Sequence, residues 1–209
     1  MTRSAVIFRV ILIALILMPV SSVVLVWVGR ERIAATRGKA LPVLGQVREF
    51  QMVEASGQPL GSAELRGRVW VAGFILTRCS GQCPIITHNM QQLQKLLPAR
   101  DDVRLVSVSV DPDYDKPAVL AAYAATNQID RANWLLLTGP RAVMEQVVRD
   151  AFKLTVDATS GTEEEPVTHS AKLVLVDRLG QIRGYYDGND VETMKVLARD
   201  VTRLLATRS

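Results

Sequence analysis

The sequence contains very few thiol and imidazole side chains. Its 209 residues include only two cysteines, Cys79 and Cys83, and only two histidines, His88 and His169. Two cysteines that are separated by three residues indicate a reversible disulfide or a pair of thiolate ligands. A purely stabilising disulfide is the alternative, although closing so short a loop removes little entropy from the unfolded chain.

The sequence also lacks basic runs interleaved with aromatic residues, internal repeats and low-complexity segments. The pI of 9.3 does not indicate an acidic partner, because six of the 25 Lys and Arg residues precede residue 43 with only one acid. Beyond that point 19 basic residues face 20 acidic residues, so the basic character belongs to the N-terminal flank. We therefore expect no nucleic-acid partner.

A single long hydrophobic run, from Val10 to Gly29, contains no ionisable side chain and is about long enough to span a bilayer. We interpret it as a transmembrane helix, with residues 1–29 forming a membrane anchor. A cleaved signal peptide is the competing interpretation, but the run is long for one, and Arg30-Glu31-Arg32 follows where small residues suit cleavage. No cysteine lies near the end of this run, which excludes lipid attachment to a cysteine there.

The orientation of this predicted anchor does not follow from charge, because basic residues flank both of its ends. Cysteine chemistry favours a main domain outside the cytoplasm. The segment before the run is too short for a transit peptide. We therefore expect a single-pass protein of the bacterial cytoplasmic membrane, with a tether at residues 30–41 and a folded domain at residues 42–209 on the periplasmic side.

Alternating apolar strands and amphipathic helices predict an α/β domain. Three segments are apolar on both faces, which is typical of central strands in a covered sheet: Val69–Leu76, Val103–Val110 and Ala171–Val176. The other predicted elements are a strand at Val47–Val53, a short helical turn at Ser62–Gly67, a hairpin turn at Asp177–Gly180, and helices at Lys116–Asn127, Pro140–Ala151 and Val191–Leu205.

The helix after the two cysteines is predicted to start with Pro84 at its first position. Its apolar residues recur at steps of four, three and four, and form one stripe: Ile86, Met90, Leu93 and Leu97. Cys83 would then cap this helix, where unpaired amides and the helix dipole favour a thiolate and lower the pKa of the thiol. The order of strand, dithiol, helix, strand, helix, strand, terminal hairpin and helix predicts a thioredoxin-like central sheet flanked by helices.

The two histidines are not equivalent. His88 lies about 200 degrees around the predicted helix from Ile86, among polar residues, and we expect it to be solvated. His169 lies just before the strand that begins at Ala171. In a thioredoxin-like fold the segment leading into that strand packs beside the dithiol, so the His169 imidazole is expected to meet both sulfurs.

Several motifs, in order, make the chain from Leu41 onward resemble the Sco/SenC family of membrane-anchored copper chaperones for cytochrome c oxidase assembly. These motifs are Phe74-Ile75-Leu76-Thr77-Arg78-Cys79 through Cys83-Pro84, Ser107-Val108-Ser109-Val110-Asp111-Pro112 with Asp115-Lys116-Pro117, Leu137-Thr138-Gly139, Thr168-His169-Ser170, and Leu175-Val176-Asp177 through Gly180. The chain departs from the family at Ser80-Gly81-Gln82, where members usually carry a proline and an acidic residue.

The resemblance implies that copper is held by Cys79, Cys83 and His169, and this donor set suits both Cu(I) and Cu(II). It also implies delivery of copper to the CuA centre in the copper-binding subunit of cytochrome c oxidase, with an upstream copper donor or thiol reductant. The alternative is a membrane-tethered thiol-disulfide reductase that keeps the oxidase's copper-binding cysteines reduced, with Cys79 and Cys83 as the redox-active dithiol. Asp111 and Asp115 are expected either near the site as orienting groups or as helix caps.

Overall fold

The structure is a computed structural model that describes residues 40–79, 81–98, 100–152 and 171–207. The chain from Leu41 onward forms one compact unit. The predicted anchor and most of the predicted tether lie outside the described residues. Among the helices of the described ranges, none is long and apolar enough to cross a bilayer.

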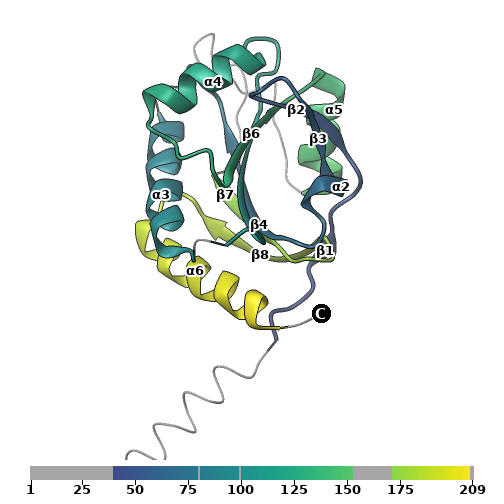
Figure 1. The fold of residues 1–209 in the computed structure, drawn as a ribbon, viewed down its shortest axis with the longest axis vertical. Coiled ribbons are helices and arrows are strands. Elements are labelled where there is room, and N and C mark those ends of the chain that lie inside the picture. Colours follow the sequence, from purple (N-terminus) through teal and green to yellow (C-terminus); the bar gives the residue numbers. More distant parts are fainter. Residues whose placement is uncertain (1–39, 80, 99, 153–170, 208–209) are drawn as a thin grey trace, which may run out of the picture. The chain divides into compact units, whose positions relative to one another are not determined.

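The compact unit is built on one eight-stranded sheet with the order β1-β8-β7-β4-β5-β6-β2-β3 (Figure 1). The three strands β4, β5 and β6 are parallel, and β7 joins β4 in antiparallel register. The strands are β1 (Gly45–Gln46), β2 (Gln51–Glu54), β3 (Pro59–Gly61), β4 (Val69–Ile75), β5 (Val103–Ser109), β6 (Trp134–Thr138), β7 (Lys172–Val176) and β8 (Gln181–Asp187).

Helices cover both faces of the sheet, which explains why the central strands are apolar on both sides (Figure 1). One face packs against α3 (Gln82–Leu96), α4 (Pro117–Thr126) and α6 (Val191–Ala206). The other face packs against α2 (Ser62–Leu65), α5 (Arg141–Gln146) and the π-helical turn η1 (Val147–Ala151). These layers confirm the predicted thioredoxin-like α/β sheet.

The predicted strand at Val47–Val53 is correct only at its end, because the chain crosses from one edge of the sheet to the other before β2 begins at Gln51. β1 pairs with β8 near one edge, whereas β2 pairs with β6 near the other. Val47 and Phe50, between these two strands, are buried in the core rather than paired in a ladder. An apolar pattern alone cannot distinguish such a buried crossing from a strand.

The other predicted elements lie close to their expected positions. The predicted helix Pro140–Ala151 consists of α5 followed by η1, whereas the central strand β6 was not among the predicted strands. The turn after β7 closes as expected, with Gly180 at a φ of 76°, a conformation that glycine adopts without strain.

The helix that follows the cysteines lies unusually close to β4. A side chain at Gly73, in the middle of β4, would place its Cβ 2.8 Å from the Met90 sulfur and 2.9 Å from a Leu173 methyl group. Met90 belongs to α3 and Leu173 to β7. The absence of a side chain at Gly73 therefore allows α3 and β7 to pack directly on the strand that leads to the dithiol.

Candidate dithiol site

The two cysteines lie where β4 ends and α3 begins. The Cys79 amide donates to the Leu76 carbonyl at 3.0 Å, which turns the chain directly after the strand. The Cys79 side chain is 8% exposed and that of Cys83 is fully buried. A partner molecule would therefore reach Cys79 before Cys83.

The prediction that Cys83 caps the helix is wrong. The helix begins at Gln82 after an N-cap at Gly81, so Cys83 occupies the second position and Pro84 the third. Proline is tolerated there because the amides of the first helical turn have no intrahelical partner to lose. Cys83 still lies in the first turn of α3.

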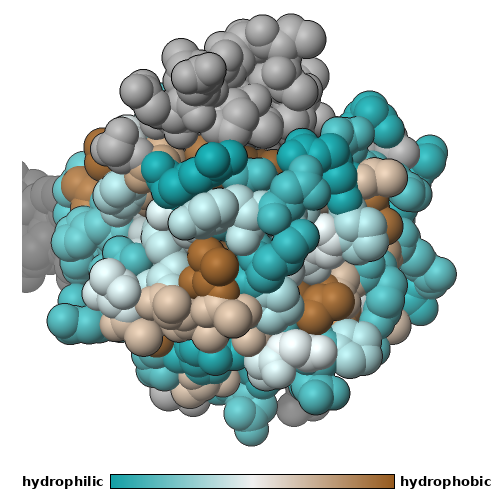
Figure 2. Space-filling model, turned by 90° about the horizontal axis from the view of Figure 1, so that it is seen from above, coloured by the Kyte–Doolittle hydropathy of each residue, from teal (hydrophilic) through white to brown (hydrophobic). Residues whose placement is uncertain are grey.

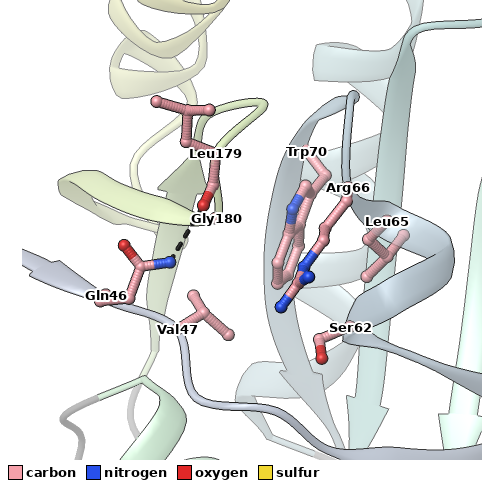
Figure 3. A pocket seen from close by; sticks show the side chains of 8 residues that line it. All are labelled: Gln46, Val47, Ser62, Leu65, Arg66, Trp70, Leu179 and Gly180. Carbon is pink, nitrogen blue, oxygen red and sulfur yellow. Dashed lines mark hydrogen bonds between the residues drawn. The ribbon is translucent and has the colours of Figure 1, made fainter.

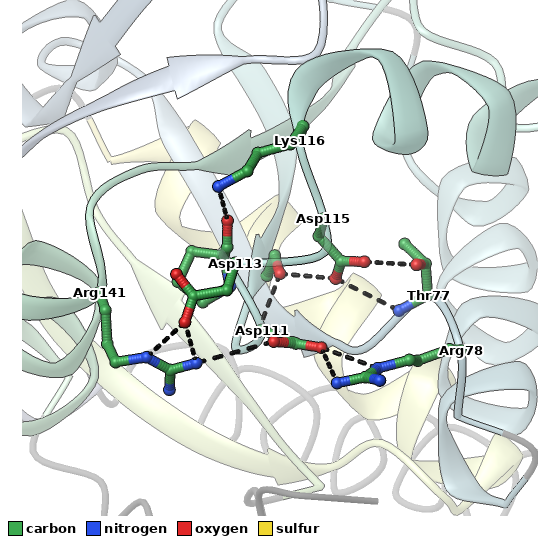
Figure 4. A network of polar contacts seen from close by, with 9 residues as sticks. Thr77, Arg78, Asp111, Asp113, Asp115, Lys116 and Arg141 are labelled. Carbon is green, nitrogen blue, oxygen red and sulfur yellow. Dashed lines mark hydrogen bonds and ion pairs between the residues drawn. The ribbon is translucent and has the colours of Figure 1, made fainter. Parts of the chain in front are cut away.

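A buried carboxylate ties the loop after β4 to the loop after β5. Asp115, which is fully buried, accepts hydrogen bonds from the Ser109 hydroxyl at 2.6 Å and from the Thr77 amide at 3.3 Å, and also from the Thr77 hydroxyl (Figure 4). Thr77 lies two residues before Cys79. Asp115 therefore positions the strand end from which the dithiol loop departs.

Burial raises the pKa of the Asp115 carboxyl, and the nearby charge of Asp111 acts in the same direction. The hydrogen bonds from Ser109 and Thr77 oppose this effect without cancelling it. Ionising Asp115 is costly because its carboxyl group is buried. Three hydroxyl or amide groups donate to it, and it has no cationic partner among the contacts described. The orienting role predicted for Asp115 agrees with these contacts.

Asp111 forms the second link between the two loops. Its carboxylate, 3% exposed, pairs with the Arg78 guanidinium at 2.7 Å, and a second guanidinium, that of Arg141, lies 3.8 Å away (Figure 4). Arg78 also stacks on the ring of Tyr114, with 5.0 Å between the guanidinium and the ring centroid. Arg78 directly precedes Cys79, so this ion pair holds the chain next to that cysteine.

Neither aspartate caps α4. The N-cap of that helix is Lys116, and no side chain accepts a hydrogen bond there. The capping alternative for Asp111 and Asp115 is therefore wrong, and their side chains point toward Arg78 and Thr77, respectively (Figure 4).

A tyrosine from α4 reaches the same region, which the sequence analysis missed. The hydroxyl groups of Tyr123 and Thr87 lie 2.7 Å apart, and Thr87 follows Cys83 by one turn of α3. Burial raises the pKa of Tyr123, and the negative charges of Cys83 and Cys79 raise it further. Tyr123 is half-buried beside Leu120 and Ala124, the buried residues of α4. Because nearly all of the α4 sequence is apolar, no apolar stripe distinguishes one side of this helix and no signal in the sequence identifies Tyr123.

The two histidines differ in what the structure describes. His88 is exposed, as predicted, and its ring lies 3.3 Å from the Gln92 side-chain amide. His169, the predicted third ligand, lies outside the described residues. Within the described ranges no group of three or more His, Cys, Asp and Glu side chains is arranged to hold a metal ion.

A shallow pocket occurs at the opposite end of β4, near the turn between β7 and β8 (Figure 3). Its empty space, open solvent included, is about 290 Å³. Arg66 is the one ionisable side chain of its lining, and it pairs with Glu49 at 2.7 Å. The lining contains no thiol, imidazole or carboxylate side chain, so the dithiol remains the candidate site.

Figure 2 shows the face of the molecule that lies at the top of Figure 1. The described residues of this face are mainly hydrophilic, and its apolar side chains form separate patches. Near the dithiol, Ile85 in the first turn of α3 and Tyr114 before α4 are each 50% exposed. A partner docking at the dithiol would therefore meet a few apolar side chains set among polar ones.

The family model described as SCO1/SenC matches residues 43–206, nearly all of the compact unit. The chain belongs to the SCO1/SenC family. It is 36% identical over 149 residues to the SCO1 protein homolog of Bacillus subtilis, which covers 70% of this chain and 76% of the relative. A relative from Stutzerimonas stutzeri whose name refers to copper binding is 33% identical over 150 residues, covering 69% of this chain and 71% of the relative.

Solved SCO1/SenC structures agree with the fold. The structure of BsSco superimposes with a TM-score of 0.70 and 32% identity, and the match covers 81% of this chain and 100% of the chain in that structure. That work describes a disulfide switch in BsSco and places it in the Sco family of cytochrome c oxidase assembly proteins. Copper binding and oxidase assembly are thus named among relatives of this chain.

Proposed function

We propose that this SCO1/SenC protein is a copper metallochaperone that delivers copper to the CuA centre of cytochrome c oxidase. The observation that carries the proposal is the pair of buried thiols at the end of β4, in a chain whose relatives are named for copper binding and oxidase assembly. Copper is the cargo, transferred by ligand exchange between docked proteins. The partners are the copper-binding subunit of the oxidase and an upstream copper donor or thiol reductant.

The donor chemistry fits copper. Two thiolates suit Cu(I) in a low-coordinate site, and an added imidazole from His169 extends the site to Cu(II). Zinc would ordinarily require a fourth ligand. Cys79, Cys83 and His169 are therefore the proposed ligands, with Asp115 and the Arg78–Asp111 pair holding the loop that carries Cys79.

We expect His169→Ala to lower the affinity for Cu(II) by about a hundredfold or more, because two thiolates alone hold this ion less well than two thiolates and an imidazole. The measurement is an anaerobic titration of the reduced domain from about Arg30 onward with each oxidation state, following stoichiometry and sulfur-to-copper charge-transfer absorption. His88→Ala is the matched control, since His88 is exposed on α3. Unchanged Cu(II) affinity and absorption in His169→Ala would refute the three-ligand site.

A second candidate function is thiol-disulfide reduction, which the different burial of the two thiols favours. The Cys79 thiolate would attack a disulfide of the oxidase subunit, and Cys83 would resolve the mixed disulfide. Two electrons and two protons would then have passed to the substrate cysteines, leaving a Cys79–Cys83 disulfide that an external thiol reductant must reduce. This route does not need His169. Full reductase activity in a His169→Ala protein that no longer binds Cu(II) would favour it.

We also propose that residues 1–29 anchor the protein in the bacterial cytoplasmic membrane, with the thiol domain on the periplasmic side. The apolar run from Val10 to Gly29 supports an anchor, and the dithiol chemistry supports the orientation. An alkaline phosphatase fusion after Leu41 is expected to be active in cells. If the alkaline phosphatase fusion is inactive, and a fusion at the same residue to a reporter that functions only in the cytoplasm is active, this orientation is wrong.

A further inference from the structure

Two arginines reach the Asp111 carboxylate from opposite sides, at the edge of the sheet where β4 and β5 end (Figure 4). Arg78, the residue before Cys79, donates from its Nε to one carboxylate oxygen at 2.9 Å. The Nη2 atom of Arg141, the first residue of α5, lies 3.8 Å from the other oxygen. Two guanidinium groups from segments far apart in the sequence therefore lie close together around one carboxylate.

Both guanidinium groups are held in place and yet remain at the surface. The side chain of Asp111 is 3% exposed, whereas those of Arg78 and Arg141 are 39% and 41% exposed. Arg78 also stacks on the ring of Tyr114, and Arg141 donates from two nitrogens to Asp113. Among the described residues, the Nη1 atom of each arginine has no hydrogen-bond partner. Each arginine therefore offers an unused donor group, in a fixed position, to a molecule that approaches from solvent.

The exposed charges of this network are mainly positive. Lys116 is exposed and donates from its Nζ to a backbone carbonyl at 2.8 Å, so it has no carboxylate partner in the contacts described. Asp113 is exposed, whereas Asp115 is fully buried. Glu145 on α5 is half-buried, and its charge acts on Arg141. Three exposed cations thus lie near one exposed and one half-buried carboxylate.

The position of these cations gives them a role in the choice of partner. The Cα atoms of Arg78 and Cys79 are about 3.8 Å apart, well within the distance of about 8 Å over which exposed charges act at physiological ionic strength. We propose that Arg78 and Arg141 form a docking site for a carboxylate, and that they select partner proteins with an acidic side chain beside the cysteines that meet Cys79. This inference rests on the proposed function, because both candidate functions bring a partner to Cys79.

Such a docking site acts on encounter and specificity more than on affinity. Exposed ion pairs contribute little binding free energy, because solvent and salt screen them. Complementary charges nevertheless raise the rate of productive encounter, and like charges exclude wrong partners. A guanidinium group is also suited to a carboxylate, since it can donate two parallel hydrogen bonds. The property to measure is therefore the dependence of the reaction rate on the charge of the reacting molecule.

Small disulfides of different charge measure this property directly. The Cys79 thiolate attacks one sulfur of the probe, which forms a mixed disulfide and releases one thiolate. Cys83 then attacks the Cys79 sulfur, which releases the second half of the probe and leaves a Cys79–Cys83 disulfide. The protein dithiol loses two electrons that the probe gains, and the protons of the protein thiols pass to the released thiolates. Dithiodipropionate carries a carboxylate on each half, cystamine carries an ammonium on each half, and hydroxyethyl disulfide is neutral.

We expect the ratio of the rate constants for dithiodipropionate and cystamine to fall by at least about threefold in Arg78→Gln and in Arg141→Gln. The reactions use the reduced full-length protein in a non-ionic detergent at low salt. A ratio is used because a changed thiolate fraction affects both probes equally. In about 1 M salt, where the Debye length is about 3 Å, the differences between the variants should nearly vanish.

Two further variants separate the charge of the docking site from other effects. Arg78→Lys should keep most of the ratio, because it retains the charge beside Cys79. Arg66→Gln is the matched control and should leave the ratio unchanged. Arg66 is likewise an exposed arginine with an ion-pair partner, but it lies at the opposite end of β4.

An unchanged ratio in both glutamine variants would overturn the inference. An equal fall in Arg66→Gln would also overturn it, because the net charge of the protein would then set the selectivity. A fall in Arg78→Lys as large as in Arg78→Gln would show that the loop has been disturbed and that charge is not the cause. If hydroxyethyl disulfide does not oxidise the natural protein, the proposed exchange chemistry itself is wrong and the inference falls with it.

Discussion

Cys83→Ser is expected to lower the affinity for Cu(I) by roughly a thousandfold or more, about 4 kcal/mol of binding free energy. The change replaces one of two soft thiolates with a hydroxyl, which is a poor ligand for Cu(I). Cys83 is fully buried in the first turn of α3. Cys79 is the other proposed ligand and the sequence has no third cysteine, so no thiol can replace Cys83. Competition with a Cu(I) chelator of known affinity, in the absence of oxygen, measures the loss. Cys79→Ser should give a similar loss.

Two controls separate ligand loss from misfolding. The buried hydroxyl in Cys83→Ser is expected to cost about 1–3 kcal/mol of unfolding free energy if it finds no partner, so urea unfolding of each variant must accompany the titration. His88→Ala removes an exposed side chain from the same helix and should leave Cu(I) affinity intact. Tight one-to-one Cu(I) binding by a folded Cys83→Ser protein would contradict the proposed site.

Asp115→Ala is expected to lower the free energy of unfolding by about 3 kcal/mol. The substitution leaves the Thr77 amide and the Thr77 and Ser109 hydroxyls without their common acceptor in a fully buried position. Because Thr77 leads directly into the dithiol loop, the susceptibility of Cys79 to alkylation should rise as well. Urea unfolding and mass spectrometry of the alkylated protein measure the two effects. Asp113→Ala is the matched control, since that exposed carboxylate of the same loop pairs only with Arg141 in the contacts described.

The stability conferred by Asp115 should also depend on pH in a direction that follows from its burial. The pKa of Asp115 in the folded protein lies above the ordinary value of 3.8. At a pH between these two values, the folded protein still holds a proton on Asp115 that the unfolded chain has lost. The unfolding free energy of the natural protein, measured relative to Asp115→Asn, should therefore fall as the pH rises through 3.8 toward the folded-state pKa. A difference that grows over this range would show that the donors stabilise the carboxylate more than burial destabilises it, and a constant difference would show that the two effects cancel.

The predictions for Cys83→Ser and Asp115→Ala address different parts of one site. The thiols supply the ligands, whereas Asp111 and Asp115 hold the ends of the loops from β4 and β5 at the same edge of the sheet (Figure 4). Parallel neighbouring strands end at the same edge, so a side chain after β5 can contact a residue just after β4. The fold thus brings Asp111 and Asp115 to Thr77 and Arg78, the residues just before Cys79, although both aspartates are distant from the dithiol in sequence.

Several features of the site could be predicted from the sequence because they depend on local pattern. The spacing of Cys79 and Cys83 identified shared thiol chemistry, and the apolar runs of β4, β5 and β7 identified a covered sheet. His88 was correctly placed on the solvated side of α3, because helical periodicity determines which side of a helix is polar. The helix boundary was wrong by two residues, since proline is compatible with any position in the first turn.

The sequence by itself determined the dithiol, the layered sheet and the family resemblance, because these arise from spacings and periods within short segments. Only the tertiary structure decided that Val47 and Phe50 cross the core, that Tyr123 meets Thr87 one turn after Cys83, and that Asn89 bonds the turn after β8. Each of these contacts links residues that are brought together by the order of the strands and the packing of the helices on them. Such contacts depend on how whole elements pack, and no local pattern encodes which distant polar group a buried side chain will meet.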